Sequence, residues 1–303
     1  TPQAVAIAAG ATLTPDATGA DTGEPLTLAQ AINATLADLL HTHDNMLLFG
    51  EDVAAKGGVY GVTKGLLAQA GAARVFDTLL DETSILGLAL GAAISGFLPI
   101  AEIQYLAYLH NAEDQLRGEA ATLSFFSKGV FTNPMVLRIA GLGYQKGFGG
   151  HFHNDNSVAV LRDIPGVILA VPSNGADAAR MLRECVRLAR EEQRVVVFLE
   201  PIALYPMRDL HAEKDGLWMT RYPDPSEIIP LGEVGVTGDG TDLAIVTFGN
   251  GVYLSQQALP GITEAGIKAR IVDTRWLSPL PKAALTKAVE GCKRILIVDE
   301  TRH

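Results

Sequence analysis

The first two hundred residues alternate between short apolar runs and longer helical patterns. Helical periodicity covers residues 82–96, about 106–126 and 176–192, and an earlier apolar stripe follows a capping box formed by Thr27 and Gln30. Unbroken apolar strands are typical of a sheet covered on both faces, so this pattern predicts an α/β fold with a parallel sheet. The predicted strands are MLLF (46–49), PIAEIQ (99–104), MVLRIA (135–140), GVILAV (166–171) and VVVFLE (195–200).

The rest of the chain suggests a second, smaller α/β unit. Residues 1–25 lack apolar periodicity and are predicted to be a linker or tail, which leaves 26–204 as the first domain. Four prolines and little periodicity make 205–240 an expected interdomain linker. Residues 241–303 form the second domain, which is expected to be incomplete because no helix follows its last strand. Its predicted strands are LAIVTFG (243–249), KARIVDT (268–274) and RILIVDE (294–300).

Composition narrows the functional class. The chain has 303 residues, of which 48% are hydrophobic, and a formal charge of −10, which excludes the basic surface of a nucleic-acid binder. Cys185 and Cys292 lie far apart, so we expect neither a disulfide nor a CxxC metal site. No apolar run reaches membrane-spanning length, and the first residues lack the basic flank of a signal peptide. A soluble, cytoplasmic protein is expected.

Four polar or aromatic side chains follow predicted strands and are expected to share one edge of the sheet. They are Glu82, Gln104, Tyr108 and His153, and ligands bind at the carboxyl ends of strands in open parallel sheets. Glu82 has a simpler interpretation as a first-turn residue stabilised by the helix dipole. However, the helix that it leads, SILGLALGAAISG, is expected to be fully buried, so the carboxylate needs a partner such as a ligand nitrogen.

Two local motifs point to weaker alternatives. His151 and His153 form an HxH pair, but no further His or Cys cluster lies nearby, so zinc is disfavoured and no metal site is predicted. The glycine-rich loop before them does not match the dinucleotide fingerprint, and no helix is expected to open directly from it. Gly238-Asp239-Gly240 resembles the start of a thiamine-diphosphate magnesium motif but lacks the later asparagines, so we interpret it as a turn.

Several of these segments, in order, resemble one enzyme family. The chain resembles the β subunit, or the β-like half of a fused chain, of the thiamine-diphosphate-dependent 2-oxo acid dehydrogenase first components, which belong to the transketolase-like superfamily. The resemblance implies a pyrimidine-binding domain followed by a transketolase C-terminal-like domain. It rests on LLFGEDVAAKGGVYGVTKGL, RVFDTLLDETSILGLALGAAISG, PIAEIQYLAYLHNAEDQ, GGHFH, IPGVILAVPSN, VVVFLEPIALY and TDLAIVTFGNGVY.

The resemblance assigns roles residue by residue. Glu82 matches the glutamate that hydrogen-bonds the pyrimidine nitrogen of the cofactor, and Leu80 falls where the family packs against the cofactor. Gln104 and Tyr108 fall at pocket positions, where Tyr108 is suited to stack on the pyrimidine face. His153 matches a family histidine that is a candidate proton donor in reductive acyl transfer.

The resemblance also implies cofactors and partners, with several departures. The Mg²⁺ ligands are expected on an α portion, either a separate subunit of an α2β2-type assembly or a fused half. A lipoyl-bearing acyltransferase is the expected acceptor, and a 2-oxo acid is the substrate. Asn154 begins an Asn-Asp-Asn stretch where the family commonly has Ser-Gln, so His151 and Asn154 are candidates for a substrate or lipoyl loop. Glu192 and Arg194 stand where some relatives bind K⁺, which disfavours that ion here.

Two other functions share this fold. One is a transketolase-type enzyme that transfers carbon units without oxidation, although such enzymes carry both cofactor-binding halves in one chain. The other is a non-catalytic assembly module, which the joint presence of Glu82, Tyr108 and His153 disfavours. Either histidine of the HxH pair remains a candidate for the acid–base role.

Overall fold

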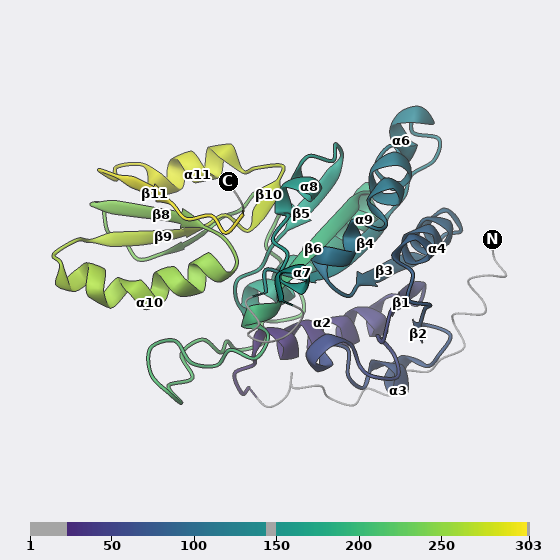
Figure 1. Ribbon diagram of the computed structural model, residues 1–303, viewed down its shortest axis with the longest axis horizontal. Coiled ribbons are helices and arrows are strands. Elements are labelled where there is room, and N and C mark those ends of the chain that lie inside the picture. Colours follow the sequence, from purple (N-terminus) through teal and green to yellow (C-terminus); the bar gives the residue numbers. More distant parts are fainter. Residues whose placement is uncertain (1–22, 144–149, 302–303) are drawn as a thin grey trace.

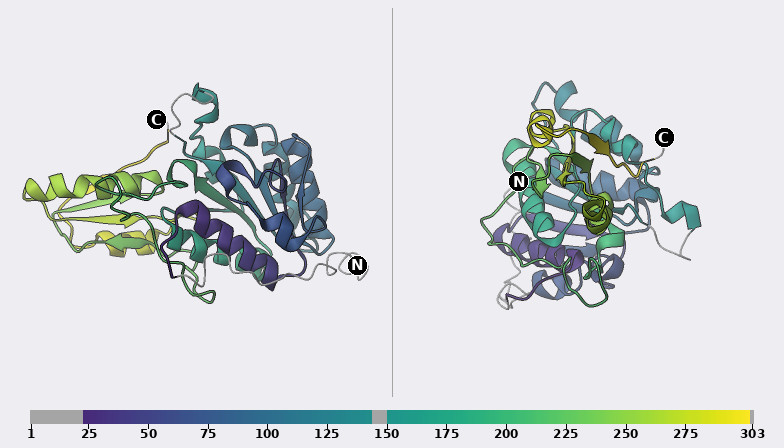
Figure 2. Two further views of the ribbon diagram at one scale, coloured as in Figure 1. Left: turned by 90° about the horizontal axis from the view of Figure 1, so that it is seen from below. Right: turned by 90° about the vertical axis from the view of Figure 1, so that its left-hand side faces the viewer.

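The computed structural model describes residues 23–143 and 150–301, which fold into two α/β units (Figure 1). The larger unit holds a seven-stranded sheet in the order β10-β5-β6-β4-β3-β1-β2, and the smaller holds a four-stranded sheet in the order β11-β8-β9-β7. The smaller unit projects from one end of the larger one (Figure 2). The alternation of strands and helices therefore produces the predicted α/β fold.

The five strands predicted in the larger unit all form, and all pair in parallel. Two further strands join them. β2 extends the sheet beyond β1, and β10 pairs antiparallel with β5 although it comes from far along the chain. The strands are β1 (Met46–Gly50), β2 (Val75–Asp77), β3 (Leu98–Ile103), β4 (Met135–Gly141), β5 (Val167–Ala170), β6 (Val195–Pro201) and β10 (Trp276–Ser278).

Both faces of the large sheet are covered, as the unbroken apolar strands predict. In β1, Met46 and Leu48 pack towards one helical layer, whereas Leu47 and Phe49 pack towards the other, because successive strand residues point to opposite faces. The first layer contains α2 (Leu28–Thr42), α3 (Leu66–Ala70) and α9 (Gly175–Glu192). The second contains α4 (Glu82–Ile94), α5 (Leu106–Leu109), the π-helical turn η2 (Gln115–Ala120) and α8 (Val158–Arg162).

Local signals place the starts of α2 and α9. Thr27 accepts a hydrogen bond from the backbone nitrogen of Gln30 (3.4 Å), and the Gln30 side chain accepts one from the backbone nitrogen of Thr27 (2.9 Å), which confirms the capping box. Asn174 caps α9 by accepting from the backbone nitrogen of Asp177 (2.9 Å). Each cap satisfies a backbone donor that has no partner inside the helix.

Three expectations about the helices are wrong. Residues 106–126 do not form one helix but are divided among α5, η2 and α6 (Leu123–Phe126), with Gly118 weakening helical propensity inside η2. A short helix, α7 (Gly150–His153), does begin at the end of the glycine-rich loop. The helix after Glu82 is not fully buried, because Leu88 and Ile94 on the outer face of α4 are 43% and 48% exposed.

The smaller unit contains the three strands predicted from its apolar runs, together with one more. β7 lies inside the segment 205–240 that we expect to be a linker, and it pairs antiparallel with β9. The Gly238–Gly240 triplet leads from β7 towards β8 without regular structure, which agrees with its interpretation as a turn. The elements are β7 (Gly235–Thr237), β8 (Leu243–Thr247), α10 (Asn250–Glu264), β9 (Ala269–Asp273), α11 (Lys282–Val289) and β11 (Ile295–Ile297).

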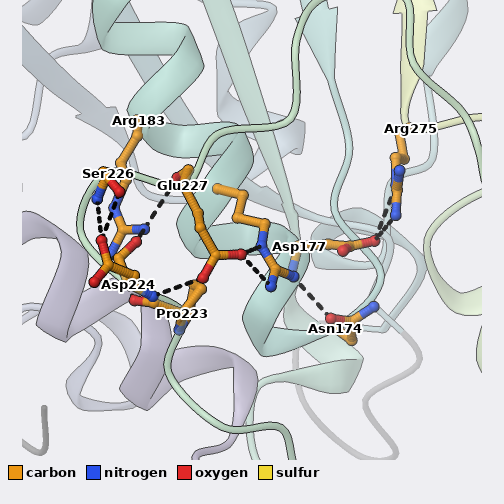
Figure 3. A network of polar contacts seen from close by, with 9 residues as sticks. Asn174, Asp177, Arg183, Pro223, Asp224, Ser226, Glu227 and Arg275 are labelled. Carbon is orange, nitrogen blue, oxygen red and sulfur yellow. Dashed lines mark hydrogen bonds and ion pairs between the residues drawn. The ribbon is translucent and has the colours of Figure 1, made fainter.

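Polar contacts with α9 hold the segment that crosses between the units (Figure 3). Arg183 donates to the backbone oxygens of Asp224 (2.6 Å) and Glu227 (3.1 Å), and Arg180 forms an ion pair with the Glu227 carboxylate (2.7 Å). Arg275, which lies next to β10, forms an ion pair with Asp177 on the first turn of α9 (2.8 Å). The crossing segment and the later part of the chain are therefore both attached to one helix.

Two further findings bear on the function. Cys185 and Cys292 are free thiols, as their separation predicts. Within residues 23–143 and 150–301, no helix is both long and apolar enough to cross a membrane.

Candidate active site

The predicted site residues gather where parallel strands β1 to β4 end. Glu82 opens α4 shortly after β2, Gln104 directly follows β3, and His153 ends α7 beyond β4. Because these strands are parallel, their carboxyl ends lie at the same edge of the sheet. Contacts among the side chains at this edge define the candidate site.

Glu82 is a buried carboxylate with little compensation from the protein. It is 8% exposed, and Asn111 donates the hydrogen bond that its Oε2 accepts, at 3.3 Å. The backbone oxygen of Asn111 accepts from the Thr83 hydroxyl (3.2 Å), so Asn111 is held by two contacts with the start of α4. Among the described residues no cation pairs with Glu82, which leaves this carboxylate suited to a ligand.

Two acidic residues that the sequence analysis did not select lie at the same edge of the sheet. Glu51 and Asp52 directly follow β1, and burial, Asp52 and Glu82 together raise the pKa of Glu51. Asp52 accepts from Lys56 (2.7 Å) and, more weakly, from Gln104 (3.4 Å). The sequence could have identified them as candidate site residues, because they directly follow a predicted buried strand. The site is therefore more acidic than the motifs alone indicate.

Tyr108 and His153 meet directly. The Tyr108 hydroxyl lies 2.6 Å from Nε2 of His153, and the two rings contact edge to face with centroids 5.6 Å apart. Phe152 and Tyr105 pack around the same pair. Burial raises the pKa of Tyr108, and the carboxylates of Glu51 and Glu82 raise it further, so Tyr108 lies within electrostatic range of both. The structure thus joins Glu82, Tyr108 and His153 in one site.

Three other predicted residues lie at the margin of this cluster. Leu80 is 72% exposed on the segment before α4, and His151 is exposed on α7. Asn154 donates from Nδ2 to the backbone oxygen of Gly150 (2.7 Å), which closes the turn around α7. The middle of the preceding glycine-rich loop, residues 144–149, lies outside the described residues. His153, and not His151, is the histidine that contacts Tyr108.

The sequence raised two possible metal sites, the HxH pair and the end of the helix before VVVFLE. In the part of the chain that the structure describes, no group of three or more His, Cys, Asp or Glu residues is arranged to hold a metal ion. At the end of α9, the Glu192 carboxylate is paired with Arg187 (2.9 Å), and the Arg194 backbone nitrogen donates to the Leu188 oxygen (3.2 Å).

Exposed apolar side chains form two groups, one on and before α4 and one on and after α6. Leu79 and Leu80 precede α4, Leu88 and Ile94 lie on its outer face, and a second group follows on and after α6. Gly87 and Gly91 also lie on the exposed face of α4, and a Cβ atom added at either would meet nothing within 4 Å. Large exposed apolar surfaces typically mark interaction sites. The second group consists of Phe125, Phe126, Val130 and Phe131.

Taken together, these side chains have the chemistry to hold a nitrogen heterocycle and to transfer a proton. A hydrogen bond from an N–H donor to an ionised carboxylate is stronger than one to a neutral acceptor. The aromatic side chains provide apolar faces against a flat ring. The ring nitrogens of the His153 imidazole can donate or accept a proton.

Comparisons with known proteins match both units. The model of the transketolase pyrimidine binding domain matches residues 24–207, and that of the transketolase C-terminal domain matches residues 232–303. The chain is 35% identical to the pyruvate dehydrogenase E1 component subunit beta of Bacillus subtilis (strain 168) over 282 residues, which are 91% of this chain and 80% of that protein. It is 33% identical to the 2-oxoisovalerate dehydrogenase subunit beta of Pseudomonas aeruginosa over 295 residues, covering 95% and 81%.

A solved structure supports the fold alone. A chain described as a split gene transketolase, inactive beta4 tetramer, superposes with a TM-score of 0.69 at 17% sequence identity. The match covers 92% of this chain and 81% of that one. The order of the two units is therefore shared with a protein of distant sequence.

Proposed function

Because this chain belongs to the β-subunit family of the thiamine-diphosphate-dependent 2-oxo acid dehydrogenase first components, we propose that it binds the aminopyrimidine half of the cofactor and acts in oxidative decarboxylation. The observation that carries the proposal is the buried Glu82 carboxylate at the head of α4, with the Tyr108–His153 pair nearby. The named relatives show the family, and the roles below are our assignments.

The donor set at the site fits an aminopyrimidine. Glu82 has one weak hydrogen bond, from Asn111, and no ion pair with a cation among the described residues, so its carboxylate can accept a hydrogen bond from a ring nitrogen. Tyr108 presents an aromatic face and Gln104 an amide at the same edge of the sheet. Leu80 is accessible on the approach to α4, where it would pack against the cofactor.

Each residue then has a definite task. When bound, thiamine diphosphate supplies a nucleophilic carbon and an electron sink for decarboxylation. Glu82 holds the ring nitrogen and favours the tautomer that takes up a proton. Tyr108 positions His153 through their hydrogen bond. His153 donates a proton during acyl transfer to a lipoyl group, because a leaving thiolate has to be protonated. His151 is exposed on α7 and Asn154 directly follows it, and both would contact the substrate or the lipoyl arm.

The proposal includes an α portion that supplies the Mg²⁺ and diphosphate ligands. Its support is the outer face of α4, the helix that Glu82 opens, which exposes Leu88 and Ile94 together with Gly87 and Gly91. Small residues on a helix face allow another helix to approach closely. We propose that this face is covered in an α2β2-type assembly and that a lipoyl-bearing acyltransferase receives the acyl group.

A reconstitution experiment tests this function. The chain, combined with a matching α portion, thiamine diphosphate and Mg²⁺, should decarboxylate a 2-oxo acid with reduction of an artificial dye. Pyruvate, 3-methyl-2-oxobutanoate and 2-oxoglutarate should be compared. Glu82→Gln should abolish the reaction, whereas Glu113→Gln, which changes an exposed carboxylate, is the matched control. Transfer of two-carbon units between sugars without dye reduction would instead indicate a transketolase-type enzyme, and no activity would favour an assembly module.

A further inference from the structure

Two contacts connect α5 and the residue after it with α7 and the segment after it. The first is the hydrogen bond between Tyr108 and His153, and the second joins Nε2 of His110 to Oδ2 of Asp155 at 2.8 Å. Each contact spans 45 positions in the sequence, so the segment 108–110 faces the segment 153–155 in a fixed register. The contact between His110 and Asp155 has no part in the function assigned above.

In the second contact, the Asp155 side chain is held in place by further hydrogen bonds. It is buried, and its Oδ1 accepts hydrogen bonds from the backbone nitrogen (3.1 Å) and hydroxyl (2.5 Å) of Ser157. Burial alone would raise the pKa of Asp155, but the hydrogen bonds from Ser157 and His110 lower it overall. The carboxylate is therefore ionised at neutral pH and is a strong acceptor for His110.

The His110 end is accessible from solvent. Its side chain is 42% exposed, and its Nδ1 lies 3.9 Å from the Glu113 carboxylate. His110 does not contact Glu82 or His153 in any hydrogen bond between described residues. Substitution of His110 is therefore expected to leave both the core and the cofactor contacts intact.

The two helices joined in this way are too short to hold their own geometry. α5 and α7 contain four residues each, and isolated helices of that length are unstable in water. The orientation of His153 therefore depends on contacts made across the gap between the helices. Tyr108 holds the imidazole itself, and the His110–Asp155 contact holds the backbone two residues further on.

We propose that His110 and Asp155 are positioning residues that set the orientation of His153 against Tyr108. Their effect on acyl transfer rests on the function proposed above, whereas their effect on the His153 ring does not.

Kinetics of three variants test the proposal in the reconstituted enzyme. His110→Ala removes the contact and should slow acyl transfer about tenfold, which corresponds to about 1.4 kcal/mol, with decarboxylation changed less than about twofold. His110→Gln keeps an amide N–H that can reach Asp155 and should restore most of the rate. Glu113→Gln removes the other acidic neighbour of His110 and should behave like the unmodified enzyme.

A thermodynamic cycle separates positioning from independent catalysis. If His110 acts through His153, then His110→Ala should cause no further loss in an enzyme that already carries His153→Ala. Additive losses would overturn the proposal, as would equal losses for His110→Ala and His110→Gln. An unchanged acyl-transfer rate in His110→Ala would overturn it as well.

The structural half of the proposal can be tested without activity. ¹⁵N-histidine NMR of the assembled protein should show that the His153 ring signals shift in His110→Ala and return in His110→Gln, while Glu113→Gln leaves them in place. If the unmodified enzyme decarboxylates no 2-oxo acid but these shifts are seen, the proposed function fails and the positioning role stands. Ring signals identical in all variants would refute the positioning role.

Discussion

Replacing Arg138 should destabilise the fold more than any surface change, because Arg138 compensates two buried carboxylates. Its guanidinium lies in the middle of the large sheet and donates to both oxygens of Glu200 (2.7 and 2.9 Å) and to Glu102 (2.7 Å). The Tyr205 hydroxyl also donates to Glu200. The strands that carry these residues, β3, β4 and β6, are central to the sheet.

The magnitude follows from what Arg138→Met would leave behind. Breaking a buried ion pair by removing one partner costs about 3–5 kcal/mol, because the remaining charge is buried without compensation. Here two carboxylates lose a common partner, so we expect a loss of at least about 3–5 kcal/mol at pH 8. Such a change is a large fraction of the stability of an ordinary domain.

The loss of stability in Arg138→Met should also depend on pH. Burial raises the pKa of Glu102 to about 7, with Arg138 opposing this effect and Glu200 adding to it. The folded chain therefore retains this proton to a higher pH than the unfolded chain, and the contribution of Glu102 makes stability fall as pH rises from about 4.5 to about 7. Without Arg138, which lowers the pKa of Glu102, Glu102 is protonated still more readily, so the loss of stability should be smaller at pH 5 than at pH 8.

Urea unfolding of the whole chain, followed by circular dichroism at both pH values, measures these effects. Arg162→Met, which removes an exposed arginine paired with Asp163, is the control and should change stability by less than about 0.5 kcal/mol. Adding Glu102→Met and Glu200→Gln to Arg138→Met should restore much of the loss, because no unpaired charge then remains. A loss below about 1 kcal/mol, or an equal loss at both pH values, would refute the reasoning.

Four further predictions concern the site and its assembly. Glu82→Gln should leave folding intact but abolish proton exchange at the thiazolium carbon in the reconstituted enzyme, as followed by NMR; an unchanged rate would identify a different carboxylate. His153→Ala should lower acyl transfer about 10²–10⁴-fold while lowering decarboxylation much less, and His151→Ala measured beside it shows which histidine acts. The isolated chain should bind thiamine diphosphate poorly; tight, magnesium-dependent binding in calorimetry would contradict this. Gly91→Phe should leave the isolated chain folded, since a Cβ there meets no neighbour, yet block assembly with an α portion in light scattering.

The local pattern of the sequence determined most of the regular structure. The apolar runs predict five strands of the large sheet and three of the small one, because burial on both faces requires continuous apolar residues. The start of α2 follows from Thr27 and Gln30 alone, since a capping box needs only residues three apart. The sequence could also point to Glu82, Tyr108 and His153 as neighbours, because the residues that follow parallel strands lie at one edge of the sheet.

Other features depend on partners far along the chain, which no local pattern reveals. Trp276 joins the large sheet by pairing antiparallel with β5, which lies about a hundred positions earlier in the chain. Its strand, β10, has only three residues, which are too few to show an alternating apolar pattern in the sequence. Leu88 and Ile94 are exposed because α4 packs on the sheet with one face only, through residues such as Ile85 and Ala89. The apolar composition of α4 alone suggested that it is buried on all sides.

The acidic and polar surroundings of the site were likewise decided by the tertiary structure. Glu51 follows a predicted strand, yet only the folding of β1 beside β2 and β3 brings it within range of Glu82. The His110–Asp155 contact joins two exposed-looking polar residues 45 positions apart, and nothing in either local sequence pairs them. Sequence periodicity thus determined which faces are buried, whereas the chain's three-dimensional path decided which charges meet, because electrostatic contacts depend on distance in space and not on spacing along the chain.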